Sequence, residues 1–347
     1  MTETQQVRPL YFDNTRVSTF FKCPRMYYFR HMRGWVREGS RVALVFGGAW
    51  HVMMEVVWTK AKENISDVQL TDLADAAFRE KWQAEGYDPN DINLDDKRNP
   101  GLARDMCLAY LVKYREWLRE ITVLCNEQPF LVPLGTTADG TPIYYIGRWD
   151  KIYMDKMKSV YVGEHKTTSL YRKSGSAAPF AAEFIQSFSP DSQVDGYQFG
   201  ALAAFGKQFR GVIVDASLVH KTVRGFTRIP VQRALANLES WAFDAKYWIN
   251  EIYDNAAMLA EARQESDYLK CFPKRTEQCQ GKYGMCSYLD LCKYGPPNPE
   301  QMNELPEGFT SSQWDPFAHN VEEGQQPMGV GDGERLIEEL KKDKWNE

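Results

Sequence analysis

The stretch GRWDKIYMDKMKSVYVGEHKTTS, Gly147–Ser169, predicts a β-hairpin that brings two acidic side chains together. Its two arms are rich in Tyr, Ile, Val and Trp, and the polar DKMK between them supplies the turn. Folding about Met157 sets Asp150 opposite Glu164, and cross-strand partners have Cβ atoms about 5 Å apart. Two carboxylates are therefore expected to meet on adjacent strands.

A lysine is expected beside these carboxylates. Glu164 and Lys166 are two residues apart, so they share one face of a strand, whereas His165 between them points away. Oxygen ligands with a neighbouring cation suit Mg²⁺ or Mn²⁺ and an attacking water beside a phosphodiester. The same residues also fit an exposed hairpin with a salt bridge, because D…ExK occurs often by chance. The hairpin alone leaves both interpretations open.

The composition indicates a globular protein of 347 residues, 43% of them hydrophobic, with enough apolar content for a sizeable core. No run of about 18 apolar residues occurs, and the start MTETQQVRPL has no apolar core segment, so we predict neither a membrane span nor a signal peptide. Seven cysteines do not suggest a secreted disulfide framework. We therefore expect a cytoplasmic location.

The net charge of −5 is unevenly distributed. Pro296–Glu347 carries twelve acids and four bases, which leaves Met1–Gly295 at about +3. Arg16–Arg41 contains seven bases, one acid and several aromatic residues. This mixture fits either a solvated helix face or a surface that contacts phosphates and stacks on bases.

Periodicity and turn residues predict helices on both sides of a mixed sheet. The expected helices are one capped by Ser18 that runs to Met32 with Pro24 in a first turn or at a kink, then 49–64, 71–85, 102–123, 192–205 and 233–262. The expected strands are 130–134, the two hairpin arms 144–153 and 159–166, 211–219 and 225–231. The acidic segment after Gly295 is expected to be flexible, with a short helix at Glu334–Lys344.

Two helices carry further candidates for the site. His51 and Glu55 lie one turn apart and face the same way, although a single histidine is more often a core residue than a ligand. Gln193 and Tyr197 lie four residues apart at the start of a helix, where a Gln amide can position a water and a Tyr can stack on a base. Pairing on a helix surface explains this second pair equally well.

The cysteines form the strongest local pattern. Cys279, Cys286 and Cys292 lie in one short loop, with Cys271 upstream. Four thiolates complete a site for Zn²⁺ or for an iron–sulphur cluster. The fourth is either Cys271, in a local knuckle, or Cys23, which would tie the first helix to the end of the folded chain. Spacing alone decides neither the ligand nor the metal.

Six motifs together resemble one nuclease family. STFFKCPRMYYF, GGAWHVMMEVV, GRWDKIY, VGEHKTT, QVDGYQFGALA and the cysteine triplet occur in the order found in RecB-like PD-(D/E)XK nucleases with an iron–sulphur cluster. That branch includes CRISPR-associated exonucleases, the nuclease domains of AddB-type helicase–nucleases and phage-encoded relatives. The resemblance covers Ser18 to Cys292.

The resemblance implies a role for each matching residue. His51, Asp150 and Glu164 would be metal ligands together with the backbone carbonyl of His165, and Lys166 would orient or activate the water. Gln193 and Tyr197 would form an accessory motif. A [4Fe–4S] cluster would be held by Cys23, Cys279, Cys286 and Cys292, which leaves Cys271 spare.

We therefore predict a PD-(D/E)XK α/β fold, with a mixed sheet flanked by helices. The nuclease domain would span residues 1–295, with a helical lobe at about 50–123 and an Fe–S region formed by 23 and 279–292, followed by an acidic flexible tail at 296–347. The expected function is a Mg²⁺- or Mn²⁺-dependent DNA exonuclease that acts on single strands or duplex ends. The tail would dock a protein partner or limit non-specific DNA binding.

Two other classes of function remain open at this stage. One is a catalytically silent DNA-binding or adaptor subunit of a recombination or CRISPR adaptation complex, which the complete set of ligands disfavours. The other is a nucleic-acid-binding protein stapled by zinc, which brown colour in the purified protein would exclude.

Overall fold

The computed structural model describes residues 8–39, 42–90, 97–172, 179–281, 284–317 and 327–329. The chain divides into two compact units. We call Ser40–Phe130 with Arg148–Ala234 the sheet unit, and Met1–Gly39, Leu131–Gly147 and Leu235–Glu347 the terminal unit. The predicted helix at Glu334–Lys344 lies outside the described residues.

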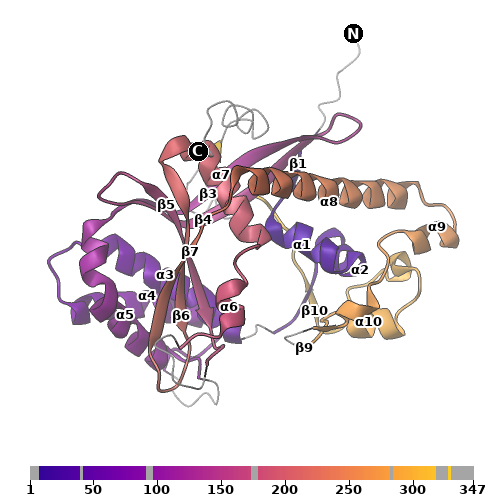
Figure 1. Cartoon of the computed structure of the whole chain (residues 1–347). Helices are drawn as coiled ribbons and strands as arrows, with labels where there is room; N and C mark the ends of the chain where they lie inside the picture. Colours follow the sequence, from indigo (N-terminus) through magenta and orange to yellow (C-terminus); the bar gives the residue numbers. More distant parts are fainter. Residues whose placement is uncertain are drawn as a thin grey trace, which may run out of the picture. The chain divides into compact units, whose positions relative to one another are not determined.

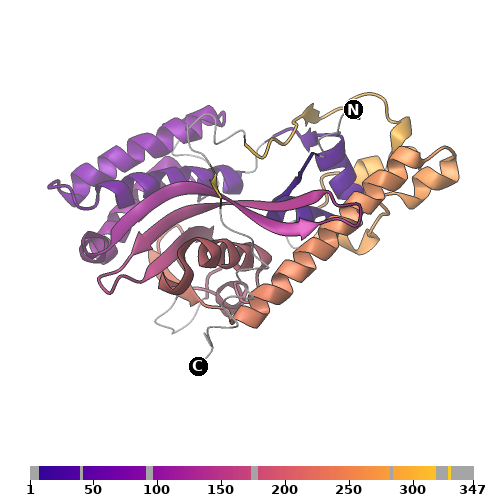
Figure 2. The same ribbon diagram turned by 90° about the horizontal axis from the view of Figure 1, so that it is seen from above.

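The sheet unit is a mixed β-sheet with helices on both faces. Its elements are α3 (Val42–Lys60), α4 (Asp67–Ala84), α5 (Pro100–Glu120), the first part of β3 (Thr122–Thr136), the second part of β4 (Pro142–Met154), β5 (Val160–Thr168), α6 (Ala182–Gln186), α7 (Ser192–Phe205), the 3₁₀ turn Gly206–Gln208, β6 (Phe209–Leu218) and β7 (Gly225–Val231). The strand order is β3-β4-β5-β6-β7, with β5 and β6 parallel and the pairs β4–β5 and β6–β7 antiparallel. Helices α3–α5 cover one face and α7 the other (Figures 1 and 2). The predicted α/β class with a mixed, helix-flanked sheet is confirmed.

The central hairpin has the predicted register. Lys151 lies opposite Gly163 and Met154 opposite Val160, so the turn centres on Met157. Asp155 closes the turn, because its Oδ1 accepts hydrogen bonds from the backbone N–H of Met157 at 2.8 Å and of Ser159 at 2.9 Å. These hydrogen bonds of Asp155 set the turn, and the turn in turn sets which residues of the two strands lie opposite each other.

Helix α3 forms the core of the sheet unit. It begins at Val42, although the sequence analysis placed its start after Gly47 and Gly48. Both glycines lie inside the helix, where each costs about 1 kcal/mol relative to Ala. Val45 and Phe46 are nevertheless buried, so burial of the first turns overrides the weak propensity of the glycines.

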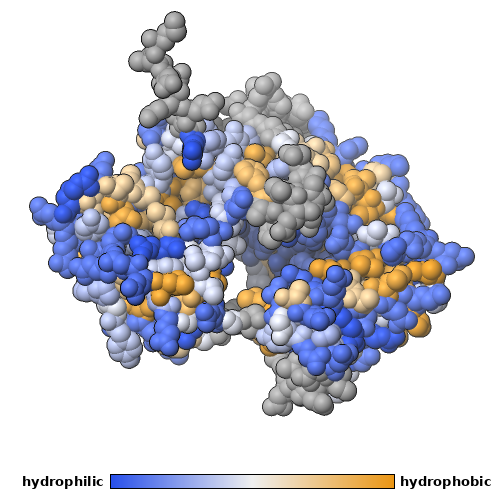
Figure 3. All heavy atoms as spheres, turned by 180° about the vertical axis from the view of Figure 1, so that it is seen from behind, coloured by the Kyte–Doolittle hydropathy of each residue, from blue (hydrophilic) through white to orange (hydrophobic). Residues whose placement is uncertain are grey.

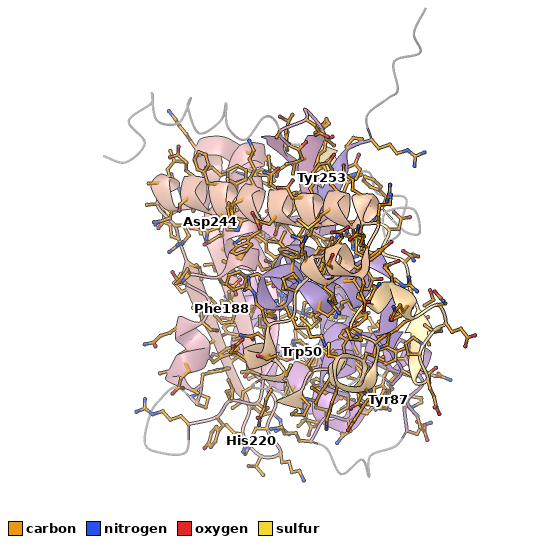
Figure 4. The ribbon with its side chains drawn as sticks, turned by 90° about the vertical axis from the view of Figure 1, so that its right-hand side faces the viewer. Trp50, Tyr87, Phe188, His220, Asp244 and Tyr253 are labelled. Carbon is orange, nitrogen blue, oxygen red and sulfur yellow. The ribbon has the colours of Figure 1, made fainter. Side chains whose placement is uncertain are left out.

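By length and composition alone, α3 is the one described helix that could cross a membrane. Its apolar residues instead pack among those of α4 and α5, and Trp50 lies in the interior with no exposed surface (Figure 4). Hydrophilic residues cover much of the face drawn in Figure 3, and hydrophobic residues gather there in separate groups. The apolar character of α3 is therefore that of a core helix.

Strand β3 is longer than predicted. The helix expected to reach Val123 ends at Glu120, and the strand begins at Thr122 rather than at Phe130. Thr122 and Val123 are β-branched, and the apolar helical period ends before them. The early part of this strand carries Glu127, which the sequence analysis did not select.

The terminal unit joins the two ends of the described chain to the hairpin tip of β3 and β4. Its elements are β1 (Leu10–Phe12), α1 (Asn14–Lys22), α2 (Pro24–Tyr27), a π-helical turn (Tyr28–Met32), β2 (Trp35–Arg37), α8 (Leu235–Glu261), α9 (Glu265–Lys270), the 3₁₀ turns Thr276–Gln278 and Pro299–Gln301, β8 (Gln280–Gly281), β9 (Gly284–Met285), α10 (Leu289–Tyr294), β10 (Phe309–Ser311) and β11 (Met328–Gly329). β1 pairs in parallel with the first half of β4, and β2 pairs with β10. Asp244 and Tyr253 both lie along the long helix α8 (Figure 4).

The first predicted helix is divided at Cys23. Asp13 rather than Ser18 caps α1, since its Oδ1 accepts from the Arg16 N–H at 2.7 Å, while the Ser18 hydroxyl donates to the Thr15 carbonyl. The backbone is extended at Cys23, and Pro24 then starts α2 in the first-turn position that tolerates proline.

The aromatic residues of the basic segment are core residues. Tyr27, Tyr28, Phe29 and Trp35 are each at most 4% exposed, and Phe29 stacks on Trp35 with ring centroids 5.6 Å apart. Arg25 is also buried, and its Nε donates to the Phe272 carbonyl at 2.9 Å. These residues therefore form neither a solvated helix face nor a surface that stacks on bases, because they are buried in the terminal unit.

The described part of the acidic tail contains regular structure. Thr310 pairs with Val36 in the two-stranded β10–β2 sheet, and the Asn298 side chain accepts a hydrogen bond from the Glu300 N–H at 3.0 Å. Backbone pairing with β2 therefore holds Phe309–Ser311 of the predicted tail.

Candidate active site

Asp150 on β4 and Glu164 on β5 lie side by side, as the register of the hairpin requires. Both side chains are buried, with 7% and 1% of each residue exposed. The Asp150 Oδ2 also accepts a hydrogen bond from the backbone N–H of His165 at 2.8 Å. Backbone pairing and this hydrogen bond together fix the two carboxylates.

Lys166 connects Glu164 to helix α7. Its ammonium group donates to Glu164 Oε1 and to the Gln193 Oε1, the latter at 3.2 Å. The Gln193 amide in turn donates to the Tyr197 hydroxyl at 2.9 Å. The structure thus brings Glu164, Lys166, Gln193 and Tyr197 into one hydrogen-bonded chain.

Helix α7 reaches this position because it packs closely on the sheet. A Cβ on Gly200 would lie 2.6 Å from the Phe130 ring, so only glycine fits there. Trp149 stacks on Phe130 at 4.2 Å, and its Nε1 donates to the Tyr197 carbonyl at 3.2 Å. This apolar contact behind Asp150 fixes the distance between the helix and the strands.

His51 approaches Asp150 from the other face, on α3. Its Nδ1 lies 3.4 Å from the Asp150 Oδ2, and its side chain is 30% exposed. The His165 ring points away from Lys166, as predicted, and packs edge-on against Trp58 with centroids 5.5 Å apart. Neither ring nitrogen of His165 has a hydrogen-bond partner among the residues that the structure describes.

Glu127 on β3 completes a group that the sequence analysis missed. One ligand atom from each of His51, Glu127 and Asp150 lies within 4.8 Å of the others, and Glu164 is not part of this group. The Glu127 Oε2 pairs with Arg148 Nε at 3.1 Å, and its backbone is left-handed with φ 47°. In the sequence, Glu127 could have been found as a carboxylate on the strand next to that of Asp150. The predicted strand began only at Phe130, so Glu127 lay outside it.

The buried charges shift one another's protonation. Burial alone would raise the pKa of Asp150, but His51 and Lys166 outweigh burial and hold it well below its ordinary value. Burial and the Asp150 charge raise the pKa of Glu164 to about 7, and Lys166 opposes this rise. Burial and Asp150 likewise raise the pKa of Glu127 to about 7. Lys166 beside Glu164 and Arg148 beside Glu127 therefore lower these pKa values by less than burial and Asp150 raise them.

Nearby carboxylates raise the pKa of both basic groups of the site. Burial lowers the pKa of Lys166, but Glu164 and Asp150 raise it by more, so it lies above the ordinary lysine value. Burial similarly opposes protonation of His51, yet Asp150 raises its pKa. An ammonium group is thus fixed beside Glu164.

These donors fit a divalent cation. They are carboxylate oxygens and one imidazole nitrogen, which Mg²⁺ and Mn²⁺ accept. The second oxygen of Glu164, Oε2, is buried and has no hydrogen-bond partner among the described residues. A bound cation would satisfy this oxygen.

The second set of predicted ligands lies in the terminal unit. The Cys286 N–H donates to the Cys279 carbonyl at 2.8 Å, and the Arg275 N–H lies 3.5 Å from the Cys23 Sγ. Burial raises the pKa of Cys292 to about 11, and the nearby Cys23 and Cys286 add to this rise. Cys23 is thus a neighbour of the late cysteines despite its distance in sequence.

In the described part of the chain, the cysteine sulphurs are not gathered as one metal site. Tetrahedral Zn–S bonds of about 2.3 Å place the sulphurs roughly 4 Å apart. Among the described residues, which include all seven cysteines, no three sulphurs lie within 4.8 Å of one another. Cys271 is buried, and its Sγ donates to the Asp267 carbonyl at 3.4 Å.

A mixed sheet with helices on both faces, and a hairpin that presents two carboxylates and a lysine, are consistent with a metal-dependent nuclease. The family model described as "PD-(D/E)XK nuclease superfamily" matches residues 14–293. The chain therefore belongs to the PD-(D/E)XK nuclease superfamily. No curated protein matches the chain.

Proposed function

We propose that this protein is a Mg²⁺- or Mn²⁺-dependent DNA exonuclease of the RecB-like branch, which hydrolyses phosphodiester bonds at single-stranded or duplex ends. The observation that carries the proposal is the arrangement of Asp150, Glu164 and Lys166 on one hairpin. Membership of the superfamily supports the nuclease chemistry. The resemblance to RecB-like motifs supports the branch and the action on DNA ends.

In this proposal His51, Asp150, Glu164 and the His165 carbonyl hold the catalytic cation. When bound, such a cation lowers the pKa of a water ligand and offsets charge on the phosphate. Lys166, fixed by Glu164 and Gln193, directs its ammonium group at the attacking water and at the negative charge that develops on the phosphate oxygens.

Gln193 and Tyr197 act by position. The Gln193 carbonyl oxygen accepts from Lys166 while its amide donates to Tyr197, so the orientation of this amide is set at both ends. We assign the pair to orienting Lys166 and the water, as an accessory motif.

Cys23, Cys279, Cys286 and Cys292 would hold a [4Fe–4S] cluster with a structural role. The proximity of Cys23 to Cys286 and Cys292 and the separate hydrogen bond of Cys271 support this ligand set. Because Cys23 and Cys279 are 256 positions apart in sequence, such a cluster would hold the two ends of the terminal unit together.

The test is digestion of end-labelled single- and double-stranded DNA with Mg²⁺ or Mn²⁺. Glu164→Ala and Lys166→Ala should each abolish metal-dependent shortening, and the label released first gives the polarity. Glu120→Ala and Lys156→Ala, which break an exposed ion pair of the same unit, are the matched controls and should cleave like the wild type.

Absence of cleavage by folded, brown wild-type protein would contradict the proposal. It would favour a DNA-binding or adaptor subunit of a recombination or CRISPR adaptation complex. A colourless protein that contains zinc would contradict the iron–sulphur assignment instead. Deletion of the acidic tail tests its proposed role, since unaltered DNA affinity and salt slope would exclude a DNA mimic.

A further inference from the structure

Two aromatic side chains, each followed in the sequence by a basic residue, meet beyond the ends of the parallel strands β5 and β6. Tyr171 and Arg172 follow β5, and His220 and Lys221 follow β6. The Tyr171 and His220 ring centroids are 4.8 Å apart, with the ring planes at 33°. His220 lies at the lower margin of Figure 4. Because β5 and β6 are parallel, both segments leave the sheet at one edge, where α/β sheets commonly bind ligands.

The loop that carries His220 is held in shape by its own contacts. The His220 Nδ1 accepts hydrogen bonds from the backbone N–H of Thr222 at 3.2 Å and of Val223 at 3.1 Å. The Arg224 guanidinium donates to the His220 carbonyl at 3.0 Å and pairs with Asp105 at 3.2 Å. Since Nδ1 accepts, the proton of the neutral imidazole lies on Nε2. The loop is therefore ordered without a ligand, which lowers the entropic cost of binding one.

Tyr171 is fixed at the protein surface by backbone pairing. It forms an antiparallel bridge with Phe180, and beside this bridge the Ala181 N–H donates to the Leu170 carbonyl at 3.1 Å. Tyr171 is half-buried, whereas Arg172 is exposed. The aromatic ring and the neighbouring cation thus have a defined place next to the His220 loop.

The charge of this region is positive. Residues 169–172 and 220–224 contain three Lys or Arg residues and no acid. Arg172 and Lys221 are exposed, and neither pairs with a carboxylate among the residues that the structure describes. Lys166 of the candidate active site is five positions before Tyr171, so their Cα atoms are at most about 18 Å apart. A nucleic-acid strand at the active site needs only a few nucleotides to span this distance.

We propose that Tyr171 and His220 form a stacking site for an unpaired base of single-stranded DNA, with Arg172 and Lys221 in contact with the neighbouring phosphates. Aromatic rings that stack on bases, beside cations that follow the backbone, are how proteins bind single strands without reading their sequence. A base inside a duplex does not offer its face to such a ring. The inference rests on the proposed action on DNA and adds a site that holds the strand outside the catalytic residues.

A simpler role for Tyr171 is to pack on His220 and hold the two loops together. Loss of that packing would change DNA binding only through the shape of the loops, and it would act on any strand alike. The two roles can be separated, because only a stacking site distinguishes a strand with bases from a strand that has none.

The experiment measures the affinity of the full-length protein in EDTA for a labelled oligothymidylate and for an abasic oligomer of the same length. Tyr171→Ala should bind the oligothymidylate at least about fivefold more weakly than the wild type, because a stacked base is lost. Its affinity for the abasic oligomer should stay within about twofold of the wild type, since no base is present to stack. Tyr171→Phe keeps the ring and should bind both oligomers like the wild type.

The phosphate contacts are tested by Lys221→Ala. This variant should bind both oligomers more weakly and should reduce the slope of affinity against salt concentration by about one. Lys156→Ala is the matched control, because it removes an exposed lysine from the turn at the other end of β5. It should bind both oligomers like the wild type.

Equal losses of affinity for the two oligomers in Tyr171→Ala, or no loss for either, would overturn the proposal. If thermal melting shows that Tyr171→Ala unfolds, His220→Ala takes its place in the same comparison, with the same expected and contrary results. The measurement needs no turnover. A loss confined to the oligothymidylate, in a protein that fails to cleave DNA, would refute the proposed nuclease and leave the stacking site standing.

Discussion

The two candidate sites of this chain are built in different ways. In the sheet unit, Asp150, Glu164 and Lys166 lie within 17 residues, and the pairing of β4 with β5 places them. In the terminal unit, Cys23 lies near Cys286 and Cys292, which are more than 250 positions away in the sequence. The first site depends on local strand register, and the second depends on long-range packing.

The donors differ in the same way. Oxygen and nitrogen ligands in the sheet unit suit a hard cation that exchanges with solvent, whereas thiolates in the terminal unit suit zinc or iron. Around Cys23, buried aromatic residues and the Arg25 contact with Phe272 supply the packing. A site set by register is expected to persist without its metal, while a site that joins distant segments is expected to need its metal in order to fold.

The largest effect should follow from Cys286→Ser. If the four cysteines hold a structural cluster, its loss should cost the terminal unit on the order of 5 kcal/mol or more, because binding free energy there is folding free energy. Thermal melting and visible absorbance should both change.

Cys271→Ser is the control for that variant. Its thiol is buried and donates to the Asp267 carbonyl, so we expect unchanged absorbance and only a small fall in melting temperature. Unchanged melting and unchanged absorbance in Cys286→Ser would contradict the structural role of the thiolates.

A smaller effect is expected from Trp149→Ala. The side chain is fully buried, stacks on Phe130 and donates to the Tyr197 carbonyl, so truncation should cost about 3–5 kcal/mol of unfolding free energy. Urea denaturation with and without EDTA measures this cost. The loss of unfolding free energy should be the same with and without EDTA, since packing rather than a metal stabilises this region. A loss seen only with EDTA would show that the region needs its metal in order to fold.

The smallest effect is a dependence of stability on pH. The pKa of Glu164 is raised to about 7 from 4.5, so the folded state keeps a proton that the unfolded state releases between these values. In EDTA, the wild type should therefore lose stability as pH rises from about 5 to about 7.5. At the upper value Glu164→Gln should be more stable than the wild type, by on the order of 1–3 kcal/mol.

Near pH 5 the two proteins should be alike, because Glu164 is then largely protonated. Urea titrations at several pH values test this difference. Addition of Mg²⁺ should raise the stability of the wild type at neutral pH more than that of the variant. If the unfolding free energies of the wild type and Glu164→Gln changed with pH in parallel in EDTA, the pKa of Glu164 would not be raised by burial.

The sequence was sufficient for the hairpin because its determinants are local. The DKMK turn and the β-rich arms define the register, and residue spacing then gives the shared face of Glu164 and Lys166. Helix α7 was also predicted with the bounds that it has in the structure, Ser192–Phe205. Its contact with Lys166 followed from the resemblance and not from its own pattern.

The features that could not be predicted depend on tertiary contacts. Glu127 belongs to a strand whose start was hidden behind the end of a helix, and its approach to His51 arises only when α3 packs on the sheet. Gly47 and Gly48 lie inside α3 despite the low helix propensity of glycine, because burial of the neighbouring residues stabilises the helix. Tyr27 and Phe29 resembled a stacking surface until their burial was known.

The central claim is that catalysis resides in the sheet unit and structural thiolates in the terminal unit. Its most direct test is the cleavage rate of Glu164→Ala, measured on the same preparation as its visible absorbance and melting temperature. The account predicts wild-type colour and stable folding with cleavage at least about 100-fold slower. Cleavage at the wild-type rate by this coloured, folded variant would contradict it.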